Sequence, residues 1–245
     1  MVEHASLEGF GSPAERAARL DALMERASAA LTRTDYFQAI ELASTALRRA
    51  HQQRDYERMA RICLPLQEAR RQVRQLASDA GASGGVFVVA RAQDLPERLA
   101  PGCYLVQPPM IGAEGRQLAD TLSASRVAGL VVTREPMTSG GQWPIVAVGA
   151  SIVRTRVTPP PCATPKAGCL TRDELRGTPP VSWFEHASET LGDAAIAAAT
   201  GEGAALVDEL LALLEATPEH EKLHQRLADV CRAIASTDNT PNPAA

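Results

Sequence analysis

The 245-residue sequence has few aromatic side chains, 4% of the total, and only two lysines, Lys166 and Lys222. It has no run of about 18 apolar residues, so no segment predicts a membrane-spanning helix. The segment Met1 to Phe10 lacks the apolar stretch of a secretory signal peptide. With 45% hydrophobic and 22% charged residues, the composition excludes collagen, a charged disordered tail and a membrane bundle.

The cysteines form no Cys-x-x-Cys pair and lie far apart along the chain. There are five of them, Cys63, Cys103, Cys162, Cys169 and Cys231. An odd number of scattered cysteines predicts reduced thiols rather than a disulfide framework. We therefore expect a cytoplasmic protein.

Alanine and arginine are abundant, with 43 and 23 residues, and both favour helices. Apolar residues recur at helical spacing in two regions, residues 12–80 and 182–236. Each region predicts three helices. Pro65 lies inside the third of these helices and predicts a kink or a break there, because proline has no backbone N–H to donate.

The periodicity changes between the two helical regions. Residues 84–158 contain short β-type runs, with a helical stretch from Ala113 to Ser125, and predict a small α/β module with a parallel crossover. Residues 159–181 are rich in proline and predict an extended linker, with one helical turn starting at Thr171. Residues 237–245 predict a disordered tail.

The expected fold class is therefore α plus α/β, with helical hairpins at both ends. Two arrangements of the helical regions are compatible with this order of elements. The two regions either pack together as one helical array that the α/β module interrupts, or they flank the module separately. We expect the first arrangement, because the third helix of the N-terminal region has no partner of its own there.

The segment from Leu20 to His51 resembles a tetratricopeptide repeat. Small residues spaced 12 and 7 apart let the two helices of such a repeat approach closely, and here they are Ala27, Ala39 and Ala46. Asp35-Tyr36 lies at the turn where the family often has Gly-Asp-Tyr, although Thr34 replaces the glycine. A looser similarity covers 183–216.

This resemblance implies a peptide-binding helical scaffold. It predicts a non-enzymatic interaction or scaffold protein, with a protein or peptide partner on the inner faces of the paired helices. The residues expected in that groove include Asp35, Tyr36 and Gln38. The alternative structural interpretation is a plain helical bundle, in which the apolar stripes form only core.

An arginine-rich segment forms a second candidate for partner binding. Residues 48–74 hold eight arginines and three acidic residues, whereas residues 181–245 carry a net charge of −8. The basic face could bind an acidic peptide, RNA or the acidic C-terminal third, or remain solvated. Tyr56 is the one aromatic residue in this segment, which makes nucleic acid the less favoured partner. The candidate partner-binding residues are Arg58, Arg61, Arg70, Arg71 and Arg74.

The sequence His220-Glu221-Lys222-Leu223-His224 matches the zinc-protease pattern H-E-x-x-H. On a helix the two imidazoles would share one face and bind zinc, and Glu221 would act as the general base. No residue at the usual spacing supplies a third ligand. We therefore expect no cofactor, and the favoured interpretation is the solvated start of a helix. A zinc-dependent hydrolase is the alternative function.

A further alternative is a small-ligand sensor. The segment Gln107 to Gly115 follows a strand and opens a helix, and its glycines could let a phosphate approach the helix N-terminus. The segment lacks a complete phosphate-binding motif, so an ordinary strand-to-helix turn is favoured.

Overall fold

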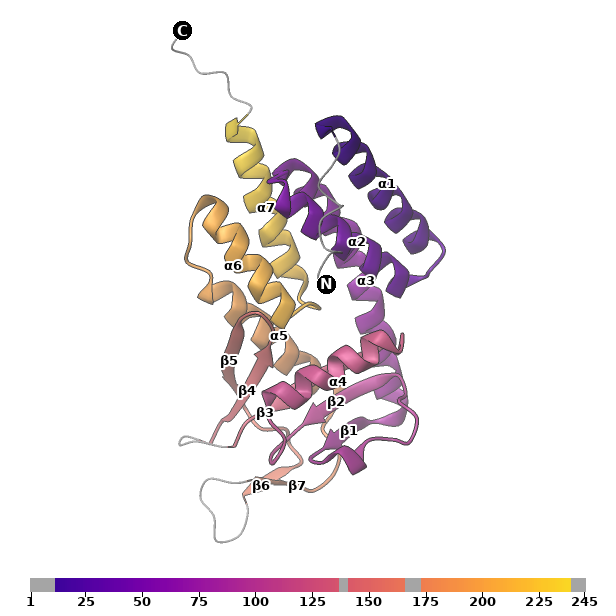
Figure 1. Cartoon of the computed structure of the whole chain (residues 1–245). Coiled ribbons are helices and arrows are strands. Elements are labelled where there is room, and N and C mark those ends of the chain that lie inside the picture. The colour runs from indigo at the N-terminus through magenta and orange to yellow at the C-terminus, as the bar shows by residue number, and fades with distance from the viewer. Residues whose placement is uncertain (1–11, 137–140, 166–172, 239–245) are drawn as a thin grey trace, which may run out of the picture.

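A computed structural model describes residues 12–136, 141–165 and 173–238 (Figure 1). The helices are α1 (Pro13–Thr32), α2 (Tyr36–Gln52), α3 (Tyr56–Gly84), α4 (Gly112–Ala124), α5 (Val181–Ala198), α6 (Gly203–Ala216) and α7 (Glu221–Asp238), with a short 3-10 helix η1 (Ala92–Asp94). The strands are β1 (Val86–Val89), β2 (Gly102–Val106), β3 (Gly129–Arg134), β4 (Trp143–Val148), β5 (Ile152–Val157), β6 (Ala163–Pro165) and β7 (Asp173–Leu175). The described residues thus contain the expected three helices on each side of an α/β module.

The turns that join α1 to α2 and α2 to α3 have the same backbone design. Each contains a residue with a left-handed conformation, Thr34 at φ 61° and Arg54 at φ 54°. An aspartate follows in each turn and caps the next helix, since Asp35 and Asp55 each accept a hydrogen bond from the N–H three residues on. The same type of turn therefore connects α1 to α2 and α2 to α3.

Small side chains lie where these helices approach one another. Ala27 and Ala46 are fully buried and Ala39 is 1% exposed, and α1 packs along α2. Ala39 also belongs to a small cluster with Ala30 of α1 and Ala69 of α3. The alanines have the packing role that their spacing suggests, while the tetratricopeptide resemblance itself stays a prediction.

The long helix α3 continues through Pro65 without being split into two helices. Proline inside a helix costs about 3 kcal/mol, because a hydrogen bond is lost and the ring crowds the preceding turn. Buried side chains on both sides of Pro65, such as Cys63 and Leu66, belong to the main hydrophobic core. Packing of α3 against α2 and α7 thus offsets the local cost of the proline.

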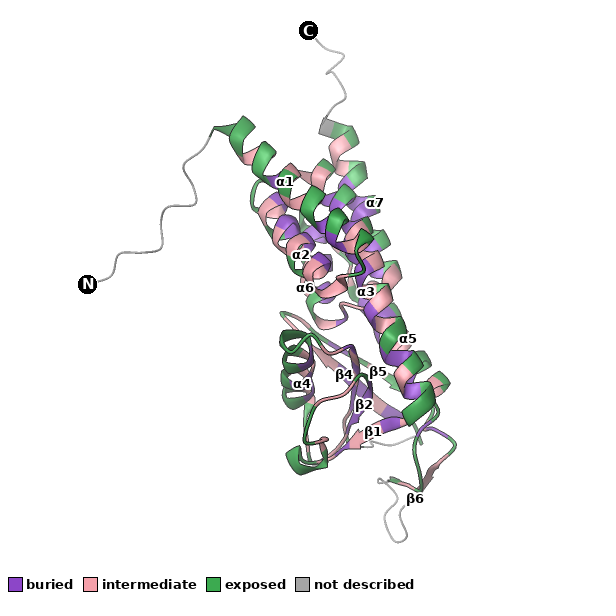
Figure 2. Cartoon of the chain, turned by 90° about the vertical axis from the view of Figure 1, so that its right-hand side faces the viewer, coloured by how far each residue is buried: buried purple, intermediate pink, exposed green. Residues whose placement is uncertain are grey.

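The main sheet has the strand order β1-β2-β3-β4-β5. The first three strands are parallel, and β4 and β5 are antiparallel to their neighbours. The predicted crossover is confirmed, since α4 connects the parallel strands β2 and β3. Helix α4 covers one face of the sheet, and α3 and α5 cover the other (Figure 2). Accordingly, Tyr104 packs with Leu118 of α4, and Leu105 belongs to the core shared with α3.

The helices from the two ends of the chain form one array. Helix α3 packs along α7, which packs on α6 (Figure 1). His51 of α2 also reaches across to Asp208 of α6, with 2.6 Å between Nε2 and Oδ1. The structure therefore shows the first of the two arrangements considered, in which the α/β module is inserted between α3 and α5.

The linker and the tail differ in part from expectation. Strands β6 and β7 pair as a two-stranded hairpin. The helical turn predicted to start at Thr171 is therefore wrong, because Glu174 lies in an extended strand, which suits a proline-rich segment. Thr171 itself lies outside the described residues. Helix α7 includes Thr237 and ends at Asp238, whereas 239–245 lie outside the described residues. No helix among the described residues has the length and apolarity to cross a membrane.

Candidate functional site

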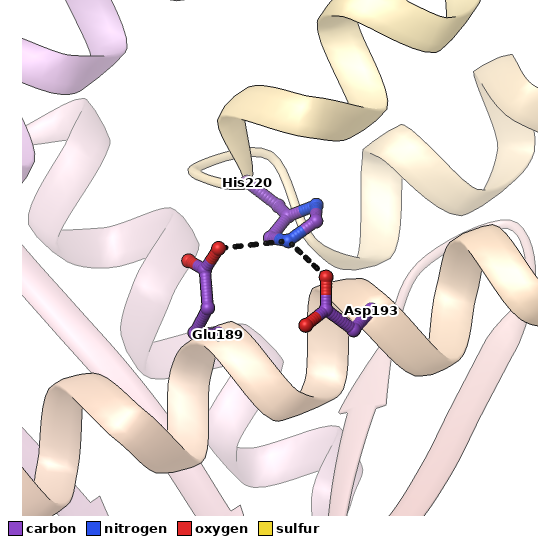
Figure 3. Close-up of side chains that lie close together, drawn as sticks. All are labelled: Glu189, Asp193 and His220. Carbon is purple, nitrogen blue, oxygen red and sulfur yellow. Dashed lines mark ion pairs between the residues drawn. The ribbon is translucent and has the colours of Figure 1, made fainter.

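A cluster of ionisable side chains lies where α5 meets the turn before α7. Glu189 and Asp193 are four residues apart on α5 and therefore share one helical face. His220 lies in the turn between α6 and α7 and points toward both carboxylates (Figure 3). Its Nε2 atom lies 3.4 Å from Glu189 Oε1 and 3.3 Å from Asp193 Oδ1. Among the described residues, these three side chains form a cluster of potential metal ligands.

The imidazole of His220 is buried in spite of its polar character. Its side chain is 2% exposed, and both ring nitrogens lack a hydrogen-bond partner, because the two carboxylate contacts do not have hydrogen-bond geometry. Burial lowers the pKa of His220, against the opposing effect of Glu189 and Asp193. The neutral form of the ring is therefore favoured beside the partly buried Glu189 and the exposed Asp193.

Lys222 contacts the same two carboxylate oxygens from α7. Its Nζ lies 2.9 Å from Asp193 Oδ1 and 3.2 Å from Glu189 Oε1. The hydrogen bond from Lys222 holds the pKa of Asp193 below its usual range, and the two carboxylates raise the pKa of Lys222. The Lys222 side chain is 55% exposed, so this ammonium can leave for solvent at little cost.

Two candidate arginines of α3 join this junction to the N-terminal helices. Arg70 lies 3.1 Å from Glu219 and Arg74 lies 3.5 Å from Glu189. Burial raises the pKa of Glu219, and the charge of Arg70 opposes that rise. Among the partners considered for the basic face, the structure thus pairs Arg70 and Arg74 with the acidic C-terminal third of the same chain.

The other candidate arginines are placed differently. Arg58 pairs with Asp21 at 2.8 Å and with Asp55 at 2.7 Å, so it stabilises the N-terminal hairpins, and its hydrogen bonds to these carboxylates raise its pKa. Arg71 pairs with Glu68 on its own helix at 2.8 Å. Arg61 lines an open groove instead.

The zinc-protease pattern does not fold as a helical pair of ligands. His220 precedes α7, whereas His224 lies within it and its Nε2 is 2.9 Å from the carbonyl oxygen of Pro218. Burial lowers the pKa of His224 to about 4. Glu221 is partly buried in the first turn of α7, and His224 does not belong to the group around His220. The favoured interpretation of a solvated helix start is wrong for both histidines, because the packing of the turn and of α7 buries them. The hydrolase alternative stays a prediction.

Sequence reasoning missed Glu189 and Asp193 because they are about 30 residues from His220 and meet it only through the packing of α5 on α7. One local signal was available. The spacing Glu-x-x-x-Asp places two carboxylates on one helical face, and Gly192 beside Asp193 leaves room for a ring.

An open groove lies between α3 and α7, with a volume of about 760 Å³. Leu64 lines it and is 70% exposed, although the residues Cys63 and Leu66 on the same part of α3 are buried. Cys63 and Ala228 form buried parts of its lining. The lining residues are Glu57, Ala60, Arg61, Cys63, Leu64, Gln67, Gln225, Ala228, Arg232, Ala235 and Ser236.

The residues expected in a groove on the paired helices have other places. Asp35 caps α2, and its Oδ1 lies 3.6 Å from Arg126. Tyr36 packs against the main hydrophobic core, and Gln38 supplies the backbone N–H that donates to Asp35. None of these three residues lines the groove between α3 and α7. Their role in partner binding stays a prediction.

Two glycines in the first turn of α4 serve the packing of this helix on the sheet. A Cβ on Gly115 would lie 1.9 Å from Thr133 Oγ1, and one on Gly112 would lie 2.8 Å from a Val148 methyl group. The Glu114 carboxylate accepts a hydrogen bond from the Ile111 N–H at 2.8 Å, at the position where a phosphate would bind. The small-ligand sensor at Gln107 to Gly115 stays a prediction.

Comparisons with protein-family models, with curated proteins and with solved structures found no match to the chain. Function must therefore be inferred from the side chains of this chain and from their geometry. Two features of the described residues serve this purpose, the groove between α3 and α7 and the polar junction of α3, α5 and α7.

Proposed function

We propose that this chain is a non-enzymatic interaction protein that binds a protein segment in the groove between α3 and α7. The observation that carries the proposal is the exposure of Leu64 in an open groove of about 760 Å³. Exposed leucines are ordinary on protein surfaces, but one that lines a concave apolar site offers an anchor point for a partner. The tetratricopeptide-like hairpins α1–α2–α3 are compatible with such a scaffold.

The shape of the groove favours an amphipathic helix as the bound segment. The surfaces of two packed helices form its walls, and a helix packs into such a groove with apolar residues spaced three and four apart. Alanine and glutamine occupy half of the wall positions around Leu64, and the small alanines leave room for larger apolar side chains of the partner.

The charges of the groove favour an acidic partner. Arg61 and Arg232 line it, against one acidic residue, Glu57. Arg61 is exposed, and Arg232 is on α7 where it contacts Asp229. Acidic residues that flank the apolar face of the partner would therefore be attracted, and basic ones would be repelled.

Buried cysteines support a cytoplasmic location for this function. Cys63, Cys103 and Cys231 are free thiols within the core, and burial raises the pKa of each to about 12. Buried neutral thiols resist oxidation, and free thiols are typical of proteins in reducing compartments.

Selection from a displayed random-peptide library tests the proposal, and it requires no candidate partner. We expect the enriched peptides to carry apolar residues at helical spacing together with acidic residues. They should bind the wild type and lose about tenfold or more in affinity for Leu64→Asp, because a charge in the apolar anchor site is desolvated on binding.

Leu76 offers a matched control on the same helix. It is 46% exposed and does not line the groove, so Leu76→Asp should bind the selected peptides as the wild type does. The variant Arg61→Glu should weaken binding of acidic peptides. Peptides that bind Leu64→Asp and Leu76→Asp equally well would refute the proposed groove.

A further inference from the structure

We propose that Glu189, Asp193 and His220 bind one divalent transition-metal ion, and that this ion takes the place of the Lys222 ammonium. The site is separate from the groove between α3 and α7, and it does not depend on the proposed function. Zinc is a suitable probe for this class of ion. The ion would tie α5 to the turn before α7, through one helix and one loop that both border α3.

The spacing of the three ligand atoms fits a metal ion of this class. Zinc binds histidine nitrogen and carboxylate oxygen at about 2.0–2.2 Å, so ligands at two corners of a tetrahedron lie about 3.3–3.6 Å apart. His220 Nε2 lies 3.3 Å from Asp193 Oδ1 and 3.4 Å from Glu189 Oε1. All three ligand atoms lie within 4.8 Å of one another, and small rotations of the Glu189 and Asp193 carboxylates would bring them to the distances of a bound ion.

The state of His220 indicates a missing ligand. Its side chain is 2% exposed, points at the carboxylates as Figure 3 shows, and has no hydrogen-bond partner on either ring nitrogen. An unpartnered buried polar group is costly, and such groups are rare in folded proteins. Coordination through Nε2 would supply the partner that this nitrogen lacks, and a neutral imidazole is the form that binds a metal.

Lys222 marks the place of the cation. Its Nζ contacts Glu189 Oε1 and Asp193 Oδ1, which are the same two oxygens that face His220. The ammonium balances the two carboxylates when no metal is bound, and its exposed side chain can swing into solvent. A divalent ion would then supply two positive charges in place of one. Unlike the ammonium, it would also coordinate the His220 imidazole nitrogen.

Titration of the chelator-treated protein with zinc, in competition with a chromophoric chelator, tests the proposal. We expect one equivalent of zinc per chain. The variant Lys222→Met should bind zinc about tenfold more tightly, because the competing charge is gone. The double variant Glu189→Gln/Asp193→Asn should lose more than about a hundredfold in affinity, because both anionic ligands become neutral.

Control variants separate this site from adventitious binding. His186→Asn removes an exposed histidine of α5 outside the cluster, and Cys162→Ser removes a partly exposed thiol, and neither should change zinc binding. His220→Asn should also lose zinc, with folding checked by circular dichroism. The proposal is overturned if the wild type takes up no zinc, if the double carboxylate variant binds as before, or if Lys222→Met gains no affinity.

Discussion

The imidazole of His220 lies directly over Gly192 of α5, where a Cβ atom on the glycine would come within 2.0 Å of the ring Cγ. This contact fixes the position of the turn before α7 against α5. It also explains why a glycine is tolerated inside a helix, where it costs about 1 kcal/mol relative to alanine. The close approach places His220 Nε2 beside Asp193, the residue that follows Gly192.

Gly192→Ala should therefore destabilise the protein. The methyl group would push the His220 ring away, and overpacking of this kind costs about 2 kcal/mol in the free energy of unfolding. Urea denaturation measures the loss. Gly84→Ala at the end of α3 is the control, because nothing lies within 4 Å of its Cβ position and alanine is the better helix former. Equal stability of the two variants would contradict the described packing of His220.

The ion pair between Arg70 and Glu219 should contribute more to the free energy of unfolding than the pair between Arg71 and Glu68. Both side chains are 22% exposed, so Arg70→Met would leave a largely buried carboxylate without its cation, at a cost of about 2 kcal/mol. Arg71 is 49% exposed and pairs locally with Glu68, so Arg71→Met should leave the free energy of unfolding nearly unchanged.

A double variant identifies the source of that loss. Glu219→Gln removes the buried charge, so Arg70→Met/Glu219→Gln should recover part of the stability that Arg70→Met loses. Chemical denaturation of the wild type, the two single variants and the double variant gives the coupling free energy. A loss that is the same with and without Glu219 would show that Arg70 acts through packing and not through this pair.

His224 should make the protein sensitive to acid. Its pKa is about 4 in the folded chain against an ordinary value of 6.5, so the unfolded chain binds the proton at higher pH than the folded chain. Stability from this residue is complete above about pH 6.5 and falls as the pH approaches about 4, with a total loss of about 3 kcal/mol.

Comparison of the wild type with His224→Gln isolates this effect, since every other titrating group is common to both proteins. The free energy of unfolding, measured by urea denaturation between about pH 7 and pH 4, should fall more steeply for the wild type. Parallel curves for the two proteins would contradict the low pKa of His224.

The two repeated turns provide a further prediction. Asp35→Ala should cost about 1 kcal/mol in the free energy of unfolding, because the first turn of α2 loses its cap. Asp55→Ala should cost more, since Asp55 also holds Arg58 at 2.7 Å. Thermal unfolding followed by circular dichroism ranks the two variants, and a smaller loss for Asp55→Ala would contradict this order.

Much of the local structure could be predicted from the sequence. The β-type runs and the helix between two of them predicted the crossover β2–α4–β3, because those signals depend on neighbours in the chain. Helical periodicity likewise predicted α1 to α3 and α5 to α7. The pairing of β6 with β7 was missed, because short extended segments carry no periodic pattern.

The candidate sites could be predicted only in part. His220 was a candidate on its motif, but the motif supplied the wrong neighbour: His224 faces Pro218, and the groups beside His220 come from α5. Arg61 was a candidate on charge, whereas Leu64 was not, because a sequence does not tell which apolar positions of a helix a partner helix leaves uncovered. Both omissions concern contacts that tertiary packing creates.

The direct test of the proposed groove is to map where a library-selected acidic peptide binds on isotope-labelled protein. Binding in the groove predicts that peptide-induced amide shift changes gather on α3 between Glu57 and Gln67 and on α7 between Gln225 and Ser236. Changes that gather instead around Asp35, Tyr36 and Gln38, or on the sheet, would contradict it and would place the partner elsewhere on the chain.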